Sequence, residues 1–474
     1  MTVNFFNPIK VSFEYGITCL NFIFGKISEI IKLFLRIFLA LQNSGQNFRD
    51  MRSFSAFILF LCTVSAIAQS NFDKYFTDKV LRFDFMLAGN NQKTVVYPGS
   101  MKEEPFWAGS KNNLVDPFNY GNLKYEIFDD AGNTLIYSRG FCTLYQEWQT
   151  TAEAKIMERS FYEVATMPYP KNKIKFVLSM RERNGSFSKL YETTIDPTDY
   201  FIRKETPVKA DITRIYYAGD PHQCVDLAFV AEGYKADEMA KFREDVKKMA
   251  DVLFAEQPFS DYKNKINIWA VEAISEESGT DIPGEKIYVN TALNSTFYTF
   301  DIDRYLTTTD IKTVNDFAAN VPHDNIIVLI NTTKYGGGGV YNYYSGTSTG
   351  HPLSDKVFIH EFGHGFAGLA DEYYSSAVAY EEFYPLNVEP WEPNITTMVD
   401  FGSKWKNLIR KDIPVPTPAE NKYNNVTGLF EGGGYSAKGI FRPESDCRMK
   451  GNGPKGFCTV CRNAIKEMLD SYTK

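Results

Sequence analysis

The sequence predicts a multidomain protein in which an N-terminal antiparallel β-sandwich precedes an α/β domain. Its 474 residues exceed what one compact core usually holds, so two domains are the starting expectation. Short runs that alternate apolar and polar residues dominate from about residue 72 to 200, which is typical of antiparallel strands. After residue 204, buried-strand runs alternate with a helix-length amphipathic run, which indicates a mostly parallel sheet.

A secretory signal peptide is predicted at residues 51–68. Arg52 follows Met51, and an apolar run occupies residues 57–64. The small-residue sequence Ala-Ile-Ala then ends at Ala68. These are the charged, apolar and cleavage-site parts of an export signal. We therefore expect cleavage after Ala68 and a mature protein that is secreted, periplasmic or held at the cell surface.

Residues 1–50 are interpreted as an over-called translation start, because a signal peptide normally begins at its own methionine. The alternative is a membrane anchor around residues 30–41, but that stretch contains Lys32 and Arg36 and is short for a span. We expect no stable membrane insertion after signal cleavage. Removing residues 1–68 removes six basic and three acidic side chains and takes the net charge from −7 to −10. That sign argues against nucleic acid or anionic membrane as the partner.

The β-sandwich is expected at residues 69–203. The alternating runs "NLKYEIF" and "TLIYSRGF" flank the turn "DDAGN", which predicts a hairpin. The runs "KIKFVLSMRE" and "KLYETTI" continue the pattern, with almost no helix-length amphipathic run between them. An antiparallel sandwich of about 130 residues fits these features.

The α/β domain is expected at residues 204–474. "CVDLAFVAEGY", "INIWAVEAIS" and "NIIVLINT" are predicted strands, and "KADEMAKFREDVKKMADVLF" is a predicted helix. The stretch "KYGGGGVYNYYSGTS" follows the third strand. Its four consecutive glycines favour either a mobile or closely approached backbone beside a tyrosine-lined cleft, or a plain surface loop.

The stretch "HEFGHGFAGLADEYY", residues 360–374, contains the pattern His-Glu-x-x-His. Ser354 and Asp355 suit the N-cap of a helix, on which His360 and His364 stand one turn apart on one face. Two imidazoles so placed can bind Zn²⁺, and Glu361 is then near the bound water, where it can act as general base. With five histidines in the chain, the number of chance matches to this pattern is only ~0.003 at ordinary glutamate usage.

This segment resembles the metzincin class of zinc peptidases, in which a glycine turn, a third ligand and, further on, a methionine-containing turn follow the helix. In the common pattern the glycine stands three residues and the ligand six residues after the second histidine, where this chain has Ala367 and Ala370. Gly368 and Asp371 stand one residue later, so the spacing from glycine to ligand is kept. The resemblance implies Asp371 as the third zinc ligand beside the two histidines, with Glu372 as the alternative.

"HEFGHGFAGLADEY" together with "CRMKGNGPKGFCTVC" resembles the IgA peptidase family of secreted bacterial metallopeptidases. That family joins an N-terminal β domain to a metzincin-like zinc peptidase domain, and the resemblance spans most of the mature chain. The specific part of this resemblance is confined to the two quoted motifs. It implies that Met449 is the methionine of the turn and packs beneath the zinc ligands without binding zinc. The alternative is an ordinary core methionine.

Five cysteines follow the predicted cleavage site, and export makes a disulfide plausible for some of them. "FCTVC" can also mark a zinc knuckle or a redox motif. However, a four-thiolate zinc site needs another close pair of cysteines, and only Cys447 stands near. We therefore predict a disulfide from Cys447 to either Cys458 or Cys461, which would hold the methionine turn in place.

Other polar side chains are weaker candidates. Three tyrosines are candidates to polarise the scissile carbonyl in the transition state, namely Tyr373, Tyr374 and Tyr435. The remaining histidines are expected to be surface or loop-stabilising residues, namely His222, His323 and His351. Of these, His351 is the closest in sequence to the predicted helix.

The leading hypothesis is a secreted zinc endopeptidase whose β-sandwich assists substrate or surface recognition. The substrate is expected to be a polypeptide or glycoprotein, for example a host or mucosal glycoprotein such as IgA. The alternative is a surface glycan- or protein-binding protein with a degenerate peptidase scaffold, but such a scaffold has no need of Glu361. A third hypothesis keeps the zinc and changes the reaction to hydrolysis of a non-peptide amide. The oligomeric state is left open.

Overall fold

The computed structural model describes residues 71–132, 134–374, 383–453 and 455–474, which belong to one compact unit. The predicted over-called start at residues 1–50 and the predicted signal peptide at residues 51–68 lie outside the described residues. The predicted boundary between residues 203 and 204 stays a prediction. No helix in the described part of the chain is long and apolar enough to cross a membrane.

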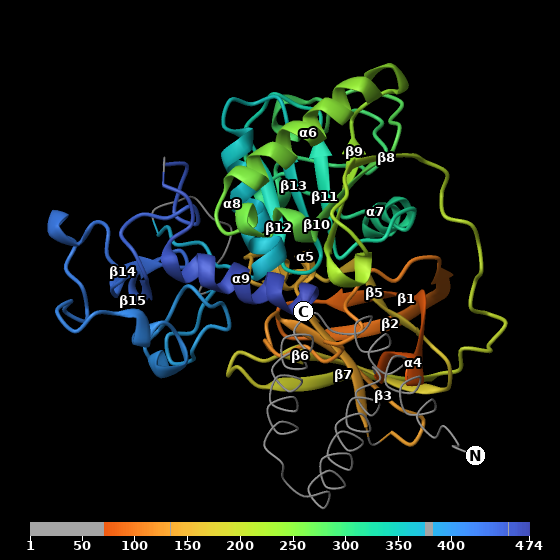
Figure 1. Ribbon diagram of the computed structural model, residues 1–474, viewed down its shortest axis with the longest axis horizontal. Coiled ribbons are helices and arrows are strands. Elements are labelled where there is room, and N and C mark those ends of the chain that lie inside the picture. Colours follow the sequence, from red (N-terminus) through yellow and green to blue (C-terminus); the bar gives the residue numbers. More distant parts are fainter. Residues whose placement is uncertain (1–70, 133, 375–382, 454) are drawn as a thin grey trace, which may run out of the picture. The chain divides into compact units, whose positions relative to one another are not determined.

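Two antiparallel sheets form the N-terminal part of the described chain (Figure 1). The first sheet has the strand order β2-β1-β5 and the second has the order β4-β3-β6-β7. The elements are α4 Asn71–Tyr75, β1 Phe76–Gly89, β2 Thr94–Glu104, β3 Leu123–Phe128, β4 Leu135–Phe141, α5 Leu144–Gln149, β5 Arg159–Pro170, β6 Ile174–Arg181 and β7 Phe187–Ile195. The predicted hairpin is present, because β3 pairs with β4 across the "DDAGN" turn.

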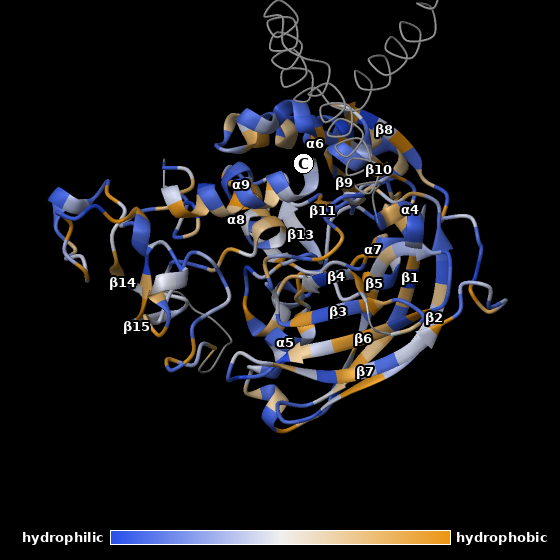
Figure 2. Ribbon diagram, turned by 60° about the horizontal axis from the view of Figure 1, so that its bottom comes forward, coloured by the Kyte–Doolittle hydropathy of each residue, from blue (hydrophilic) through white to orange (hydrophobic). Residues whose placement is uncertain are grey.

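Aromatic side chains pack between these two sheets. The ring of Phe83 on β1 meets the ring of Phe176 on β6 edge-on, with 5.2 Å between the centroids. Tyr125 on β3 donates a hydrogen bond of 2.5 Å to the carbonyl of Thr166 on β5. Buried and partly exposed residues alternate along β3, which lies beside β6 in the second sheet (Figure 2). The period of two in the sequence therefore arises from strands with one face against the other sheet.

Glu163 on β5 is the exception to this pattern, because its carboxyl group is fully buried. Neither carboxyl oxygen has a hydrogen-bond partner among the described residues. Burial raises the pKa of Glu163 to about 8, far above the value of about 4.3 for an exposed glutamate. The folded state therefore holds a proton here that the unfolded chain has already released at neutral pH.

This shift predicts a pH-dependent loss of stability. Because the folded pKa is the higher one, stability is full below about pH 4 and falls as the pH rises towards 8. Glu163→Gln removes the ionisable group, so we expect the variant to be more stable than the wild type by a few kcal/mol at pH 8 and about equal at pH 4.5. Denaturant unfolding at the two pH values measures the difference. Exposed Glu158→Gln is the control, and an equal effect of Glu163→Gln at both pH values would contradict the prediction.

A six-stranded sheet follows, with the strand order β12-β13-β11-β9-β10-β8. Its strands are β8 Asp211–Tyr216, β9 Val225–Glu232, β10 Ile266–Glu272, β11 Asn325–Ile330, β12 Gly337–Val340 and β13 Tyr344–Ser348. The four inner strands run parallel, while β8 and β12 are antiparallel edge strands. Every residue of β9, β10 and β11 is buried. The predicted mostly parallel sheet is therefore confirmed, and both of its faces are covered.

Four helices and a hairpin complete this part of the chain. They are α6 Met239–Ala255, α7 Ile311–Ala318, α8 Ser354–Ala367, α9 Thr459–Thr473, and the hairpin of β14 Phe430–Gly433 with β15 Ser436–Arg442. Helix α8 lies against β12 and β13 and also contacts α6 and α9. The hairpin lies on the left of the sheet in Figures 1 and 2. This arrangement places α8 between the edge of the sheet and the C-terminal segments.

Polar contacts join the N-terminal sheets to the six-stranded sheet. The guanidinium of Arg82 on β1 pairs with Asp316 on α7 at 2.8 Å, and both are buried. Beside β4, the backbone N–H of Cys142 donates to the carbonyl of Tyr341, next to β12, at 2.9 Å. The N-terminal sheets therefore reach the edge of the sheet where α8 lies.

Candidate metal centre

Helix α8 carries both histidines of the His-Glu-x-x-His pattern. The helix begins at Ser354 with Leu353 at the cap position, one residue before the predicted cap. The side chain of Ser354 accepts a hydrogen bond of 3.1 Å from the backbone N–H of His351 instead of capping the helix. The predicted apolar stripe is buried, and its residues are Val357, Phe358, Phe362 and Phe366. With that stripe against the core, His360 and His364 face a cavity.

Three ligand-type atoms meet at this point. The Nε2 atoms of His360 and His364 lie 3.1 Å apart. The Oδ1 atom of Asp371 lies 3.0 Å from the first and 3.3 Å from the second. Nitrogen and oxygen ligands about 2.0–2.1 Å from a tetrahedral ion stand about 3.3 Å apart from one another. The three atoms are thus arranged as ligands of one metal ion would be.

Hydrogen bonds of the two Nδ1 atoms determine which ring nitrogens of the histidines face the centre. Nδ1 of His360 donates to the carbonyl of Arg448 at 2.9 Å, and Nδ1 of His364 donates to the carbonyl of Leu369 at 2.5 Å. Because a carbonyl only accepts, each Nδ1 carries a proton, and a neutral ring then has its lone pair on Nε2. Oδ1 of Asp371 is itself buried without a hydrogen-bond partner among the described residues. When both rings are neutral, three lone pairs converge here, which a cation can balance.

The same geometry shifts the pKa values of these groups. Burial opposes a charge on His364, yet the carboxylate of Asp371 outweighs it and raises the pKa of the imidazole to about 9. Burial likewise opposes a charge on Asp371, but the two imidazoles hold the pKa of that carboxyl well below its ordinary value. For Glu361, burial dominates and raises the pKa above that of an exposed glutamate. Glu361 is therefore a stronger proton acceptor than a glutamate in water.

The third ligand-type residue reaches the histidines through a glycine turn. Gly368 ends helix α8 in the left-handed conformation, with φ of 61°, as the sequence predicts. The chain then turns back so that Asp371 meets the helix. The backbone carbonyl of Asp371 accepts from the N–H of Gly434 at 2.9 Å, and its Oδ2 accepts from the hydroxyl of Tyr435 at 2.6 Å. The turn after β14 therefore orients the carboxylate.

Glu372, the alternative third ligand, points elsewhere. Its Oε1 lies 3.2 Å from Sγ of Cys461, inside a group of three buried cysteines. Neighbouring residues on an extended segment project to opposite sides, so only one of the two carboxylates can face the histidines. The structure brings Asp371 to that position.

Met449 packs against α8 beside the histidines. It is fully buried, and a Cβ atom added to Gly363 would lie only 2.8 Å from its sulfur. Its backbone carbonyl accepts from the N–H of Glu372 at 2.8 Å. The preceding residue, Arg448, supplies the carbonyl that orients His360. The turn therefore supports both the helix and the segment that carries Asp371.

The predicted disulfide is wrong. All five cysteines in the described residues are free thiols. The sulfur atoms of Cys447 and Cys461 lie 3.7 Å apart, against about 2.05 Å in a disulfide. The prediction fails because it considers cysteine pairs only. In the structure three thiols share one buried space with the carboxyl group of Glu372.

Three of the four consecutive glycines, residues 337–339, lie in the edge strand β12 beside the helix. A Cβ atom on Gly339 would lie 2.1 Å from the backbone oxygen of Glu361. Such a contact is far inside van der Waals distance, so only glycine lets the strand lie this close. Of the two interpretations, the closely approached backbone is correct and the plain surface loop is not.

Gly339→Ala is therefore expected to displace the helix backbone at Glu361. We expect at least a tenfold loss of peptide hydrolysis and a loss of stability of about 1–3 kcal/mol, typical of overpacking. Gly346→Ala on β13 is the matched control, because its added Cβ would meet its neighbours at 3.6 Å or more, which is ordinary contact. Hydrolysis rates and melting temperatures of both variants check the prediction, and wild-type activity in Gly339→Ala would refute it.

A cavity of about 440 Å³ opens in front of the histidines, a size typical of ligand sites. Its walls include Tyr373 and Tyr435, whereas Tyr374 lies outside it. The N-terminal part of the chain contributes three further residues to the wall, namely Asn122, Cys142 and Glu147. The sequence does not point to these residues, because they are more than 200 positions away from the histidines.

Arg304 is a further wall residue that the sequence analysis missed. Its guanidinium donates to the hydroxyl of Tyr373 at 3.4 Å, and no motif surrounds it. The remaining histidines fulfil the expected local roles. Nδ1 of His222 lies 3.3 Å from the carbonyl of Gly109, and His351 accepts from the backbone N–H of Leu353 at 3.1 Å. Nδ1 of His323 lies 3.1 Å from the carbonyl of Val321.

Comparison with known families agrees with this geometry. The family described as IgA Peptidase M64 matches residues 213–425 and 419–469. The N-terminal domain described as Peptidase M64 N-terminus matches residues 71–192. No curated protein matches the chain. Because the two families together span both the N-terminal sheets and the candidate metal centre, this chain belongs to the IgA peptidase M64 family and is a peptidase.

Proposed function

We propose that this peptidase is an exported zinc endopeptidase with a metzincin-like centre. His360, His364 and Asp371 would hold the zinc ion, which leaves one position open towards the cavity. The observation that carries the proposal is the meeting of these three ligand atoms within 3.3 Å of one another. When bound, zinc supplies the positive charge that acidifies a water molecule and polarises the scissile carbonyl.

Glu361 is the general base in this mechanism. Its carboxylate lies beside the two histidines at the cavity wall, so it can take a proton from the attacking water and pass it to the leaving amine. The raised pKa of Glu361 suits the first transfer, because a more basic carboxylate accepts a proton more readily. Tyr373 and Tyr435 border the same cavity, where a hydroxyl can donate to the oxygen that gains negative charge.

The substrate is proposed to be an extended polypeptide that lies along the edge strand. β12 is the outermost strand of its sheet, and Tyr305 forms an isolated bridge with Gly337 at its start. The strand residues Gly337, Gly338 and Gly339 line the cavity. An edge strand can pair with the backbone of a peptide whatever its side chains are. The glycines bring the strand into close contact with Glu361, so a peptide paired with the strand would lie near that side chain. A host or mucosal glycoprotein such as IgA is the candidate natural substrate.

The N-terminal sheets are proposed to assist substrate recognition. Asn122, just before β3, and Glu147, on α5, lie in the cavity wall, and the hydroxyl of Tyr305 donates to Glu147 at 2.5 Å. A substrate in the cavity would therefore contact both parts of the chain. The competing hypothesis of a binding protein with a degenerate scaffold leaves the three converging ligand atoms and Glu361 without a role.

Metal removal tests the proposed function directly. Dialysis against 1,10-phenanthroline is expected to abolish cleavage of casein, because the water is no longer acidified without the ion. Zinc added back in stoichiometric amount is expected to restore cleavage, whereas Mg²⁺ is not, since a centre of two histidines and one carboxylate suits zinc. Cleavage that persists in protein shown by elemental analysis to be free of metal would refute the proposal.

A further inference from the structure

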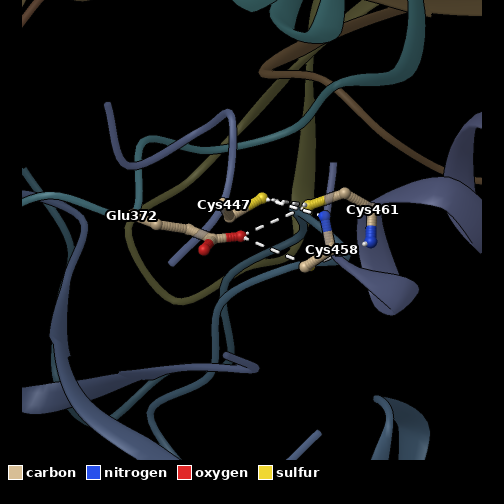
Figure 3. Close-up of side chains that lie close together, drawn as sticks. All are labelled: Glu372, Cys447, Cys458 and Cys461. Carbon is tan, nitrogen blue, oxygen red and sulfur yellow. Dashed lines mark hydrogen bonds between the residues drawn. The ribbon is translucent and has the colours of Figure 1, made fainter. Parts of the chain in front are cut away.

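A second group of metal-ligand side chains lies outside the catalytic centre (Figure 3). It consists of Cys447, Cys458, Cys461 and Glu372, and the four ligand atoms all lie within 4.8 Å of one another. Each of the four side chains is fully buried. Cys458 and Cys461 come from the start of α9, whereas Cys447 precedes the methionine turn and Glu372 follows Asp371.

The spacing of these atoms matches a tetrahedral site. Sγ of Cys447 and Sγ of Cys461 are 3.7 Å apart. Oε1 of Glu372 is 3.2 Å from Sγ of Cys461 and 3.9 Å from Sγ of Cys458. Zinc bonds of about 2.3 Å to sulfur and about 2.1 Å to oxygen require separations of about 3.8 Å between two sulfurs and about 3.6 Å between sulfur and oxygen.

One buried oxygen of this group has no partner in the described part of the chain. Oε2 of Glu372 has no hydrogen-bond partner among the described residues. A disulfide would use two of the three sulfurs and leave the third beside a buried carboxylate. One divalent cation would neutralise charge at all four ligands at once, which removes the cost of burying them unpaired.

Neighbouring groups hold the four side chains in this arrangement. The backbone N–H of Cys458 donates to Sγ of Cys447 at 3.2 Å, and that of Cys461 donates to Sγ of Cys458 at 3.5 Å. The side-chain amide of Asn394 donates to Oε1 of Glu372 at 3.0 Å. Such outer contacts orient metal ligands and stabilise their charged forms.

We propose that Cys447, Cys458, Cys461 and Glu372 bind a second, structural zinc ion. Three thiolates select zinc over Ca²⁺ or Mg²⁺, which prefer oxygen ligands. Four protein ligands in a buried position leave no open coordination site, which is typical of structural rather than catalytic zinc. This site does not depend on the catalytic zinc for its ligands.

The second ion would connect three segments that lie around the catalytic centre. It ties the start of α9 to the turn that contains Met449 and to the segment that carries Asp371. Glu372 is adjacent to Asp371, so its coordination would hold the third catalytic ligand in place from behind. The second site would therefore support catalysis without touching the substrate.

Metal analysis of the purified protein tests the proposal. We expect two zinc ions per chain in the wild type, one in Cys461→Ser, and one in the double variant His360→Ala/His364→Ala. Cys224→Ser, which removes a buried thiol elsewhere, is the control and is expected to keep two. After exchange with cobalt, wild type and the double histidine variant should show a thiolate-to-metal charge-transfer absorption that Cys461→Ser lacks.

A second measurement covers the case in which Cys461→Ser does not fold. A mercurial thiol reagent added to wild-type protein is expected to release one zinc ion per chain, detected with a chelating dye. Thiol titration of the denatured, metal-free protein should find every cysteine reduced. The proposal is overturned by a wild type with a single zinc that the double histidine variant loses, or by a thiol count two short of the cysteine count, which indicates a disulfide.

Discussion

Replacing Glu361 with glutamine is expected to lower kcat/KM for peptide hydrolysis by about 10²–10⁴-fold while the proposed catalytic zinc stays bound. This range is what a positioned general base contributes. Glutamine has the same shape, so it keeps the packing of this side chain against Gly337, whose added Cβ would lie 2.9 Å from Cγ of Glu361. It cannot accept the proton of the attacking water, and only the polarisation of the carbonyl remains.

The measurement pairs kinetics on a fluorogenic peptide with zinc content and melting temperature. Glu244→Gln, on an exposed position of helix α6, is the matched control and should keep wild-type kinetics. If Glu361→Gln retained activity within threefold of the wild type, another group would have to be the base. If it lost its zinc, the effect would report on metal binding instead of proton transfer.

Asp371→Ala is expected to remove the catalytic zinc and with it the hydrolytic activity. The carboxylate is the proposed third ligand, and its Oδ1 lies 3.0 and 3.3 Å from the two Nε2 atoms. Loss of an outer contact to a ligand already costs 10–100-fold in metal affinity, so removal of the ligand itself should cost more than 100-fold. Competition with a zinc-chelating dye measures the affinity, and Asp400→Ala at an exposed position is the control.

Glu372→Gln distinguishes the two neighbouring carboxylates. Asp371→Ala and Glu372→Gln should each bind one zinc ion fewer than the wild type, but the two variants should lose it from different sites. Asp371→Ala should keep the thiolate-to-cobalt absorption and lose hydrolysis, whereas Glu372→Gln should lose that absorption and keep zinc at the histidines. Hydrolysis that is lost in Glu372→Gln but kept in Asp371→Ala would show that the assignment of the third ligand is reversed.

Local rules in the sequence were enough to predict the framework. The runs that became β9, β10 and β11 are continuously apolar because both faces of those strands are covered. Helix α8 was predictable because a spacing of four residues puts His360 and His364 on one face. Gly368 was predictable as the helix end because glycine adopts positive φ without steric cost. In each case the cause lies within a few residues of its effect.

The rest depended on segments that meet only in the folded chain. The sequence left Asp371 and Glu372 as alternatives because adjacent residues differ only in the side to which they project. The backbone determines that side, and Gly434 and Met449 hold this backbone through hydrogen bonds. The disulfide was a wrong prediction because cysteine spacing does not show that Glu372, 75 positions before Cys447, completes the group. Contacts between distant segments have no period or spacing along the chain, so packing alone determines which side chains share a buried space.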